Sequence, residues 1–458
     1  MGPLGGKISE NGEDRLGMFR DLPGAIAFYS FQVTAMSTFF AHRLRNKFSA
    51  SAVQDFNQGI PQTLLDIEDK RRTNLFTWRG QFSPQLVENL LLAYCPRDAT
   101  VLDPFCGSGT VLYECGYLGL QAVGCELNPA AWILSRLYEF INLSLGDRNQ
   151  VITSVSGKLQ QQFPQPELFQ PLECDRLEVT AFQTHLFSIY QDSNPLEQAI
   201  LDALVILLDI DNQQPIHIPE IHTIFWGICQ YIRDFPESEN SVKSYLGDAR
   251  CLPVATDTID FVLTSPPYIN VFNYHQNYRH SVELLNWNLL EIAKSEIGSN
   301  RANRRNRFFT VIQYCLDVAL IFQEINRVCQ PGARIIFVVG YESTVLGVPF
   351  YNAQIISELA TLGGQFELVL TQQRQFKNKF GKMIREDLLH LVNGNTILSE
   401  GDWEVGVRQV AEAALRNGLE QVSEKNKGAL LEAIAKVPDI GRSPLYFRQP
   451  TPKNSFIK

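Results

Sequence analysis

The fold of this chain is constrained most by a strand, a glycine-containing turn, a helix and a second strand that follow one another between residues 101 and 126. The apolar run Val101–Asp103 leads into the turn PFCGSGT, and a helix is predicted over Val111–Leu120. The next short strand, Gln121–Glu126, ends in an acidic residue. This strand–helix–strand pattern is typical of a parallel sheet with helices on its faces, so we predict an α/β fold.

The same alternation returns in the second half of the chain. Ile259–Thr264 reads IDFVLT, which is apolar enough for a strand that is buried on both faces. A long amphipathic helix is predicted over Thr310–Val328. Three further strands are predicted at Ala333–Val339, Gln365–Leu370 and Glu386–Val392.

We divide the chain where this alternation begins and stops. Residues 1–75 are predicted to be an N-terminal helical extension, and residues 76–142 the first half of the α/β domain. Residues 143–243 interrupt the pattern and are predicted to be a mainly helical insertion, used for target recognition or for docking a partner. Residues 244–393 form the second half of the domain, and residues 394–458 a helical tail.

Composition narrows the class of protein. Hydrophobic residues make up 45% of the chain, which is enough to fill a large core. A net charge of −9 argues against binding polyanions through overall charge, so a nucleic-acid contact would need a local basic surface.

The nine cysteines include no CxxC pair and the histidines no HxxxH pair, so we expect no metal site. Without an apolar run of membrane-spanning length, we expect a cytoplasmic protein with no membrane contact.

Gly107 and Gly109 determine what the turn after the first strand can bind. Glycine allows backbone conformations that other residues avoid, and it lets a ligand approach the backbone closely. The helix that follows begins with unpaired N–H groups, so the turn suits a nucleotide-like ligand. Leu112 stands where a dinucleotide-binding turn has its third glycine, and the sequence has no P-loop pattern. A tight structural turn is the alternative interpretation.

Two acidic residues at strand ends are candidates for contacts to such a ligand. Glu126 lies 23 residues after Asp103 and ends the second strand, where a carboxylate can accept hydrogen bonds from both ribose hydroxyls. Its alternative role is to cap a surface helix. Asp248, in the sequence GDAR, is placed to accept a hydrogen bond from an adenine amino group, although a turn-stabilising aspartate fits equally well.

The tetrapeptide Ser265-Pro266-Pro267-Tyr268 directly follows the buried strand IDFVLT. Proline fixes φ and has no N–H group, so the two prolines leave carbonyl oxygens and the serine side chain as a rigid set of acceptors. Such acceptors can hold an exocyclic amine and orient its lone pair, and the tyrosine can stack on a flat ring. An ordinary Pro-Pro turn is the alternative.

The combination of DPFCGSGT with TSPPY resembles the motif pair of the S-adenosylmethionine-dependent amino-methyltransferases of DNA, the N4-cytosine/N6-adenine group. The resemblance covers residues 76–142 and 244–393, and SPPY is its specific part. It implies a class I methyltransferase-like fold, with a doubly wound, mostly parallel, seven-stranded sheet and S-adenosylmethionine as cofactor. It also implies methyl transfer to the exocyclic amine of a base flipped out of double-stranded DNA.

Individual roles follow where the sequence matches the motifs of this family. Members with serine at the first catalytic position mostly methylate cytosine N4, so Ser265 favours that target, with adenine N6 as the alternative. The segment RGQFSPQL, residues 79–86, is similar to the one that closes over the methionine part of the cofactor. The cofactor-binding candidates are Phe82, Ser83, Pro84, Asp103, Phe105, Gly107, Gly109, Glu126 and Asp248. The catalytic candidates are Ser265, Pro266, Pro267 and Tyr268.

Two acid-free basic clusters lie in the catalytic half and are candidate DNA contacts. Arginine and lysine at this density bind phosphates and release counterions, although an ordinary solvated surface is the alternative. The polar, aromatic loop after SPPY is a candidate wall for the pocket of a flipped base. The DNA-contact candidates are Arg301, Arg304, Arg305, Arg307, Arg374, Lys377, Lys379 and Lys382.

Two other functions stay open. An RNA methyltransferase acting on guanine N2 of tRNA would share the glycine turn, but it usually carries an Asp-first tetrapeptide and an N-terminal RNA-binding module. A non-catalytic subunit with a cofactor fold would bind DNA or a partner, and a degraded tetrapeptide would favour it. Here the tetrapeptide and the glycine turn are both intact. A cognate restriction or defence-system subunit is a further candidate partner.

Overall fold

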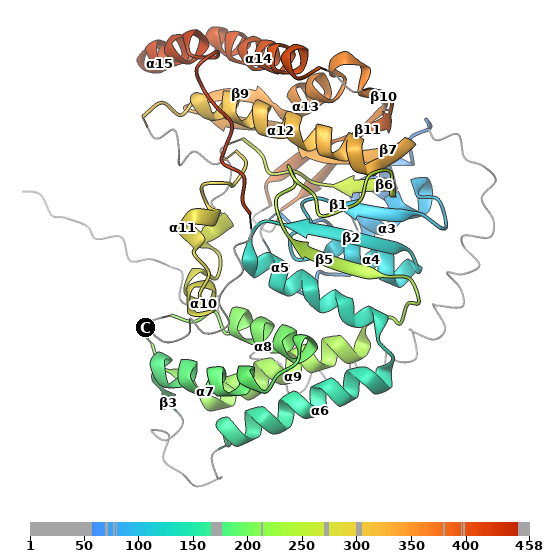
Figure 1. Ribbon diagram of the computed structural model, residues 1–458. Coiled ribbons are helices and arrows are strands. Elements are labelled where there is room, and N and C mark those ends of the chain that lie inside the picture. Colours follow the sequence, from blue (N-terminus) through green and yellow to red (C-terminus); the bar gives the residue numbers. More distant parts are fainter. Residues whose placement is uncertain are drawn as a thin grey trace, which may run out of the picture. The chain divides into compact units, whose positions relative to one another are not determined.

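The protein is described by a computed structural model, in which a seven-stranded sheet forms the centre (Figure 1). The structure describes residues 57–447 except 69–71, 77, 79, 166–175, 212–213, 270–273, 299–304, 379–380, 395 and 397–398. Most of the predicted N-terminal helical extension, residues 1–75, lies outside this part of the chain. The strands of the sheet are β1 (Thr100–Asp103), β2 (Gln121–Glu126), β5 (Val242–Leu246), β6 (Ile259–Thr264), β7 (Cys329–Gly340), β10 (Phe366–Lys377) and β11 (Met383–Asn393).

The strand order is β10-β11-β7-β6-β1-β2-β5, and all strands except β11 run in the same direction. β11 pairs antiparallel with β7 on one side and with β10 on the other. This doubly wound sheet with one reversed strand confirms the predicted class I methyltransferase-like fold.

The order of the strands reverses between β1 and β6. From β1 the chain proceeds outward through β2 to β5, and it then returns to β6 and proceeds the other way through β7. Ligands of open α/β sheets bind outside the carboxyl ends of the strands at such a point. Asp103 ends β1 and Thr264 ends β6, so these residues mark where a site is expected.

Helices cover both faces of the sheet because its strands are apolar on both sides. Val101 belongs to one core cluster and its neighbour Leu102 to the other, since successive strand residues point to opposite faces. The first cluster includes residues of α3 (Pro84–Tyr94), α4 (Thr110–Leu118) and α5 (Pro129–Arg136). The second includes residues of α12 (Phe309–Val328), α13 (Asn352–Ala360), α14 (Glu400–Asn417) and α15 (Glu424–Ala435).

The described part of residues 143–243 contains four α-helices, which lie between β2 and β5 in the chain and gather next to α5 (Figure 1). They are α6 (Leu145–Gln162), α7 (Val179–Gln191), α8 (Pro195–Leu207) and α9 (Ile218–Asp234), with a small sheet of β3 (Arg176–Leu177) and β4 (Ile216–His217). α8 packs on both α5 and α9, so this helical layer extends the core of the first cluster.

Arg148, on α6, ties this layer to the α/β domain. Its side chain is buried, and its guanidinium donates five hydrogen bonds of 2.5–3.3 Å to backbone carbonyl oxygens. Two of these carbonyls belong to Phe140 and Ile141, after α5, and three to the end of α9 and the two residues that follow it. One side chain thereby donates to carbonyls at two helix ends, where intrahelical donors run out.

The remaining elements are short. They are α2 (Gln62–Asp66), α10 (Arg279–Leu284), α11 (Leu289–Ile292), a hairpin of β8 (Glu342–Val345) and β9 (Val348–Tyr351), and several 3-10 turns. None of the helices among the described residues is both long and apolar enough to pass through a membrane.

Candidate active site

Asp103 and Thr264 join the two halves of the domain at the point where the strand order reverses. The Thr264 hydroxyl donates a hydrogen bond of 2.6 Å to Asp103 Oδ1, which also accepts the N–H of Phe105 at 3.1 Å. Burial raises the pKa of Asp103 to about 7, although these two hydrogen bonds act in the opposite direction. The carboxyl group therefore holds the start of the glycine turn against the strand that carries SPPY.

The two glycines of the turn have different roles. Gly107 has φ of +52°, and a Cβ atom there would lie 3.3 Å from the Trp78 ring, so a side chain would press on that ring. Gly109 has φ of +90°, and its Cβ atom would lie 2.7 Å from the Tyr138 ring. Gly109 therefore permits the turn to pack against the segment after α5, whereas Gly107 faces the cleft described below.

Glu126 is held in one orientation by two backbone groups. Its Oε2 accepts the N–H of Gly107 at 2.9 Å, and its Oε1 accepts the N–H of Asn128 at 2.7 Å. Burial raises the pKa of Glu126 to about 7 against the effect of these hydrogen bonds, and the nearby carboxylate of Glu296 raises it further. The side chain thus connects the end of β2 to the glycine turn.

A cleft of about 930 Å³ opens at the carboxyl ends of β1, β2, β5 and β6. Both halves of the domain contribute to it. It is lined by Trp78, Gly80, Gln81, Phe82, Asp103, Pro104, Phe105, Cys106, Gly107, Ser108, Thr110, Glu126, Leu127, Asn128, Gly247, Asp248, Ala249, Ser265, Pro267, Glu296 and Ile297.

Some of the predicted site residues line this cleft, and others lie outside it. Those that line the cleft are Phe82, Asp103, Phe105, Gly107, Glu126, Asp248, Ser265 and Pro267. Ser83 and Pro84 instead begin α3, as N-cap and first helical residue. Gly109 packs against the Tyr138 ring, and Pro266 and Tyr268 are not among the described residues that line the cleft.

The tetrapeptide lies at the carboxyl end of β6. The hydroxyl oxygens of Ser265 and Tyr268 are 3.2 Å apart, so the tyrosine can fix the orientation of the serine side chain. The Tyr268 ring packs on Gly340, where a Cβ atom would lie 3.1 Å from it. Burial is the main cause that raises the pKa of Tyr268 above its usual value, so this hydroxyl stays protonated at neutral pH.

Several cleft residues were not predicted from the sequence. Gln81 contacts the Ser108 hydroxyl and the carbonyl of Phe76 through its side-chain amide, and it therefore links the segment before α3 to the glycine turn. Asn128 caps α5 through a hydrogen bond to the N–H of Ala130. The sequence Asn128-Pro129 predicts this helix start but not a place in the cleft, whereas nothing in the sequence pairs Gln81 with Ser108.

Glu296 was also missed, and it connects the cleft to the segment after SPPY. Its Oε1 accepts the backbone N–H of His275 at 2.9 Å, and its Oε2 lies 2.8 Å from Nδ1 of the same residue. Both side chains are buried. The pair fixes one ring nitrogen of His275 and holds the segment near the cleft wall.

Asp248 lines the cleft, but its carboxylate is already bound by neighbouring groups. Oδ1 accepts the backbone N–H and Nε of Arg250, and Oδ2 accepts Nη2 of Arg250 and the N–H of Tyr446. The Asx-turn alternative is therefore present in the structure, together with an ion pair. A contact to an adenine amino group stays a prediction.

The DNA-contact candidates separate by exposure. The structure contradicts the predicted DNA contact of Arg374, because its side chain is only 6% exposed. Its Nε donates to Glu386 at 2.7 Å and its guanidinium stacks on Phe376, so it is not available to a phosphate. Lys377 is exposed at the end of β10, and Lys382 is exposed in the turn directly before β11. Arg305 is exposed and Arg307 half-buried, whereas Arg301, Arg304 and Lys379 lie outside the described residues.

Known proteins with similar sequences are type II methyltransferases. M.BsoBI of Geobacillus stearothermophilus is 21% identical over 408 residues, which cover 65% of this chain and 80% of that protein. M.AvaI of a Nostoc species is 24% identical over 269 residues, 48% of this chain and 55% of that one. M.MjaII of Methanocaldococcus jannaschii is 34% identical over a short stretch of 67 residues, 14% of this chain and 13% of that one.

A solved SAM-dependent methyltransferase from Methanosarcina mazei aligns at 11% identity and a TM-score of 0.30, over 65% of this chain and 93% of that one. The fold assignment rests on the strand order instead. A family described as DNA methylase, comprising N6 and N4 methyltransferases, matches residues 37–133, which include the glycine turn and Glu126. Taken with the motifs DPFCGSGT and TSPPY, these matches support a relationship to the DNA amino-methyltransferases, whose cofactor is S-adenosylmethionine.

Proposed function

We propose that this protein transfers a methyl group from S-adenosylmethionine to the exocyclic amine of a base in double-stranded DNA, with cytosine N4 as the target. The observation that carries the proposal is the position of SPPY. Ser265 and Pro267 line the same cleft as Gly107 and Glu126, at the carboxyl ends of adjacent strands. Serine at the first position supports cytosine, and adenine N6 is the second candidate.

The cleft fits the cofactor. Glu126 lines the cleft and offers its carboxylate oxygens to ribose hydroxyls. Gly107 leaves free the space beside Trp78 that a side chain would fill. Phe105 and Phe82 supply apolar walls. When bound, the cofactor supplies the electrophilic methyl group.

The residues of SPPY provide acceptors for the target amine. An amine that approaches the cleft past Ser265 meets the serine hydroxyl oxygen and the carbonyl oxygens of a rigid Pro-Pro segment. Hydrogen bonds from the amine to these acceptors localise the nitrogen lone pair and stabilise the positive charge that develops on nitrogen. The base reaches this position only after it has left the duplex stack. The methylated amine then releases its proton to solvent.

The direct test is to incubate the purified protein with radiolabelled S-adenosylmethionine and unmethylated genomic DNA, and to identify the labelled nucleoside. N4-methylcytosine is the expected product. N6-methyladenine would keep the mechanism but reject the target proposed from Ser265. Label in RNA added in parallel, and none in DNA, would point to the RNA methyltransferase alternative. A full-length protein that binds the cofactor and transfers no label to either would favour the non-catalytic subunit.

Cofactor binding is expected to weaken as the pH falls below about 7. Ribose hydroxyls donate to the ionised form of Glu126, whose pKa of about 7 in the free protein must fall when they bind. The hydrogen bonds between ribose and Glu126 are therefore fully formed above about pH 7 and are lost as the pH falls. Below this pH the affinity for the cofactor should fall by up to about tenfold per pH unit. Calorimetric titration in buffers of different ionisation enthalpy should show proton release on binding just below this pH.

The matched variant for this experiment is Glu126→Gln, which keeps the shape of the side chain and cannot ionise. It should bind weakly at all pH values and release no proton. Asp103 also lines the cleft and has a raised pKa of about 7, so it is the other group that titrates in this range. A Glu126→Gln protein that keeps the full pH dependence would assign the effect to Asp103 and contradict the role given to Glu126.

Removing the exposed lysines of the β10–β11 hairpin, Lys377 and Lys382, should weaken DNA binding equally for all sequences. Each lost phosphate contact lowers the slope of log K against log salt concentration by about one. The double variant Lys377→Ala/Lys382→Ala should therefore lose affinity and up to about two units of slope. Lys427→Ala, on α15 next to Glu424, is the control and should change neither. An unchanged slope in the double variant would remove the hairpin from the DNA interface.

A further inference from the structure

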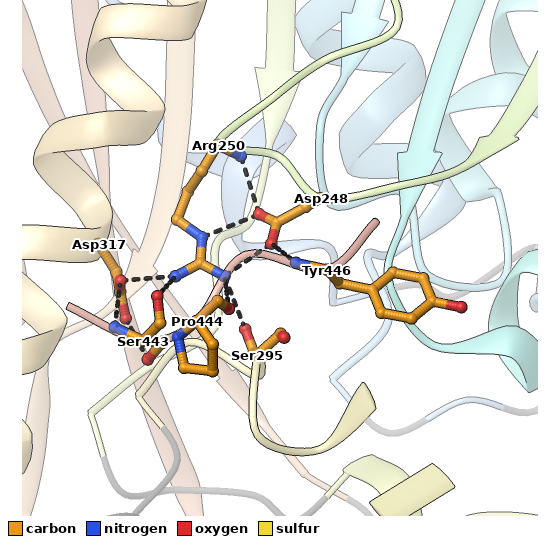
Figure 2. Close-up of polar contacts among 7 residues, drawn as sticks. All are labelled: Asp248, Arg250, Ser295, Asp317, Ser443, Pro444 and Tyr446. Carbon is orange, nitrogen blue, oxygen red and sulfur yellow. Dashed lines mark hydrogen bonds and ion pairs between the residues drawn. The ribbon is translucent and has the colours of Figure 1, made fainter. Parts of the chain in front are cut away.

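The turn after β5 contains a buried arginine that lies between two buried aspartates (Figure 2). Arg250 Nη2 is 2.6 Å from Oδ2 of Asp248, and its Nη1 is 2.6 Å from Oδ1 of Asp317, on α12. All three side chains are at most 2% exposed. A buried arrangement of two carboxylates and one guanidinium is unfavourable unless further hydrogen bonds satisfy it.

Those further hydrogen bonds come from the segment that follows α15. The carbonyl oxygens of Ser443 and Pro444 accept hydrogen bonds from Arg250 at 3.0 and 2.9 Å. In return, the N–H and hydroxyl groups of Ser443 donate to Asp317 at 3.0 and 2.6 Å. Figure 2 shows this segment passing beside the guanidinium.

The same network reaches two parts of the cleft wall. The N–H of Tyr446 donates to Oδ2 of Asp248 at 3.1 Å, and Asp248 lines the cleft. Arg250 Nη2 donates to the carbonyl of Ser295 at 3.2 Å, and the next residue, Glu296, also lines the cleft. The segment 443–446 therefore holds, from behind, the residues that face the cofactor space.

The charges of the buried cluster do not balance, so its carboxylates need the hydrogen bonds that this segment donates. With both aspartates ionised the cluster carries one excess negative charge in a buried place, and burial raises the pKa of Asp317 although Arg250 and Ser443 lower it. Three donors of the segment, the N–H groups of Ser443 and Tyr446 and the Ser443 hydroxyl, point at the two carboxylates. Without them the carboxylates would lose these hydrogen bonds, and we expect Asp248 and the 295–297 turn to shift.

We propose that Ser443–Tyr446 is a positioning segment of the cofactor site, and that Arg250 transmits its position to Asp248 and to the turn that carries Glu296. The segment touches neither substrate nor cofactor. It determines how tightly the cofactor is held, not how fast the methyl group moves once it is bound. This inference rests on the proposed function, because it assigns the cleft to S-adenosylmethionine.

The test compares two truncated chains with the full-length protein. One ends after Arg442 and lacks the segment; the control ends after Phe447 and keeps every contact described above. Binding of S-adenosylmethionine is measured by calorimetry, and methyl transfer to DNA as KM for the cofactor and kcat. The shorter chain should bind at least about tenfold more weakly, with KM raised by the same factor and kcat little changed. The control should match the full-length protein.

A pair of point variants covers the case in which the shorter chain fails to fold. Tyr446→Pro removes the N–H that donates to Asp248, whereas Tyr446→Ala keeps it. Only the proline variant should weaken cofactor binding. Unchanged affinity in the shorter chain or in Tyr446→Pro, or equal weakening by Tyr446→Ala, would overturn the proposal. Failure of the full-length protein to bind the cofactor would instead reject the proposed function.

Discussion

Replacing Ser265 by alanine is expected to lower kcat for methyl transfer by roughly 100-fold or more, while the affinity for S-adenosylmethionine stays unchanged. The serine oxygen is the side-chain acceptor that SPPY presents to the cleft, and it lies 3.2 Å from the hydroxyl oxygen of Tyr268. Without it, the target amine loses a hydrogen-bond acceptor where positive charge develops on nitrogen. The cofactor contacts that we propose for Glu126 and Gly107 would be untouched, so the loss should appear in kcat and not in the binding constant. Single-turnover rates with saturating cofactor, beside calorimetric binding, measure both quantities.

Ser265→Thr is the matched control, because it keeps a hydroxyl group at the same position and should retain a measurable part of the activity. Tyr268→Phe removes only the hydroxyl that contacts Ser265 and should give an intermediate loss. Full activity in Ser265→Ala would show that the tetrapeptide does not hold the amine, and the assignment of the catalytic site would have to be abandoned.

The largest effect on stability is expected from Arg148→Met. Methionine fills much of the same space, but it leaves five backbone carbonyls without the donors that Arg148 supplies. Loss of these buried hydrogen bonds should lower the free energy of unfolding by about 3–5 kcal/mol. Urea denaturation followed by circular dichroism would measure this change.

Arg233→Met, on α9 in the same helical layer, is the control for this experiment. Its side chain is partly exposed and donates to Asn149, so its loss should cost less than about 1 kcal/mol. Equal stability of the two variants would show that Arg148 does not tie the layer to the domain.

The sequence predicted the central fold because its strongest signals are local. An apolar strand followed by a glycine turn, and IDFVLT followed by two prolines, each identify a strand end without knowledge of the rest of the chain. The long helix predicted at Thr310–Val328 corresponds to α12 within one residue. These elements are periodic and apolar, so tertiary contacts do not need to override their local preference.

The polar arms of the β10–β11 hairpin could not be predicted in the same way. β10 continues to Lys377 through TQQRQFK, which has little apolar alternation, because each residue there pairs with one on β11. The error on Arg374 has the same origin. A basic residue in a polar run was taken as exposed, but Glu386 on the paired strand and Phe376 bury it.

Contacts between distant parts of the chain also could not be predicted from the sequence. Arg250 and Ser443 are 193 residues apart, and nothing in the sequence around either residue indicates that they pair. The GDAR sequence suggested a ligand contact for Asp248, but it carried no sign that Tyr446 would bind the same carboxylate. Such pairs depend on the tertiary fold, so a single sequence cannot reveal them.

The two backbone hydrogen bonds to Glu126 have a consequence for the entropy of binding. Gly107 and Asn128 already fix the rotamer of this carboxylate, so a ligand hydroxyl that reaches it does not have to immobilise a freely rotating side chain. Immobilising such a side chain on association costs about 0.5–1.5 kcal/mol. The Glu126 carboxylate is therefore preorganised for the ribose that we propose it binds, and the affinity for that ribose would gain from order that folding has already established.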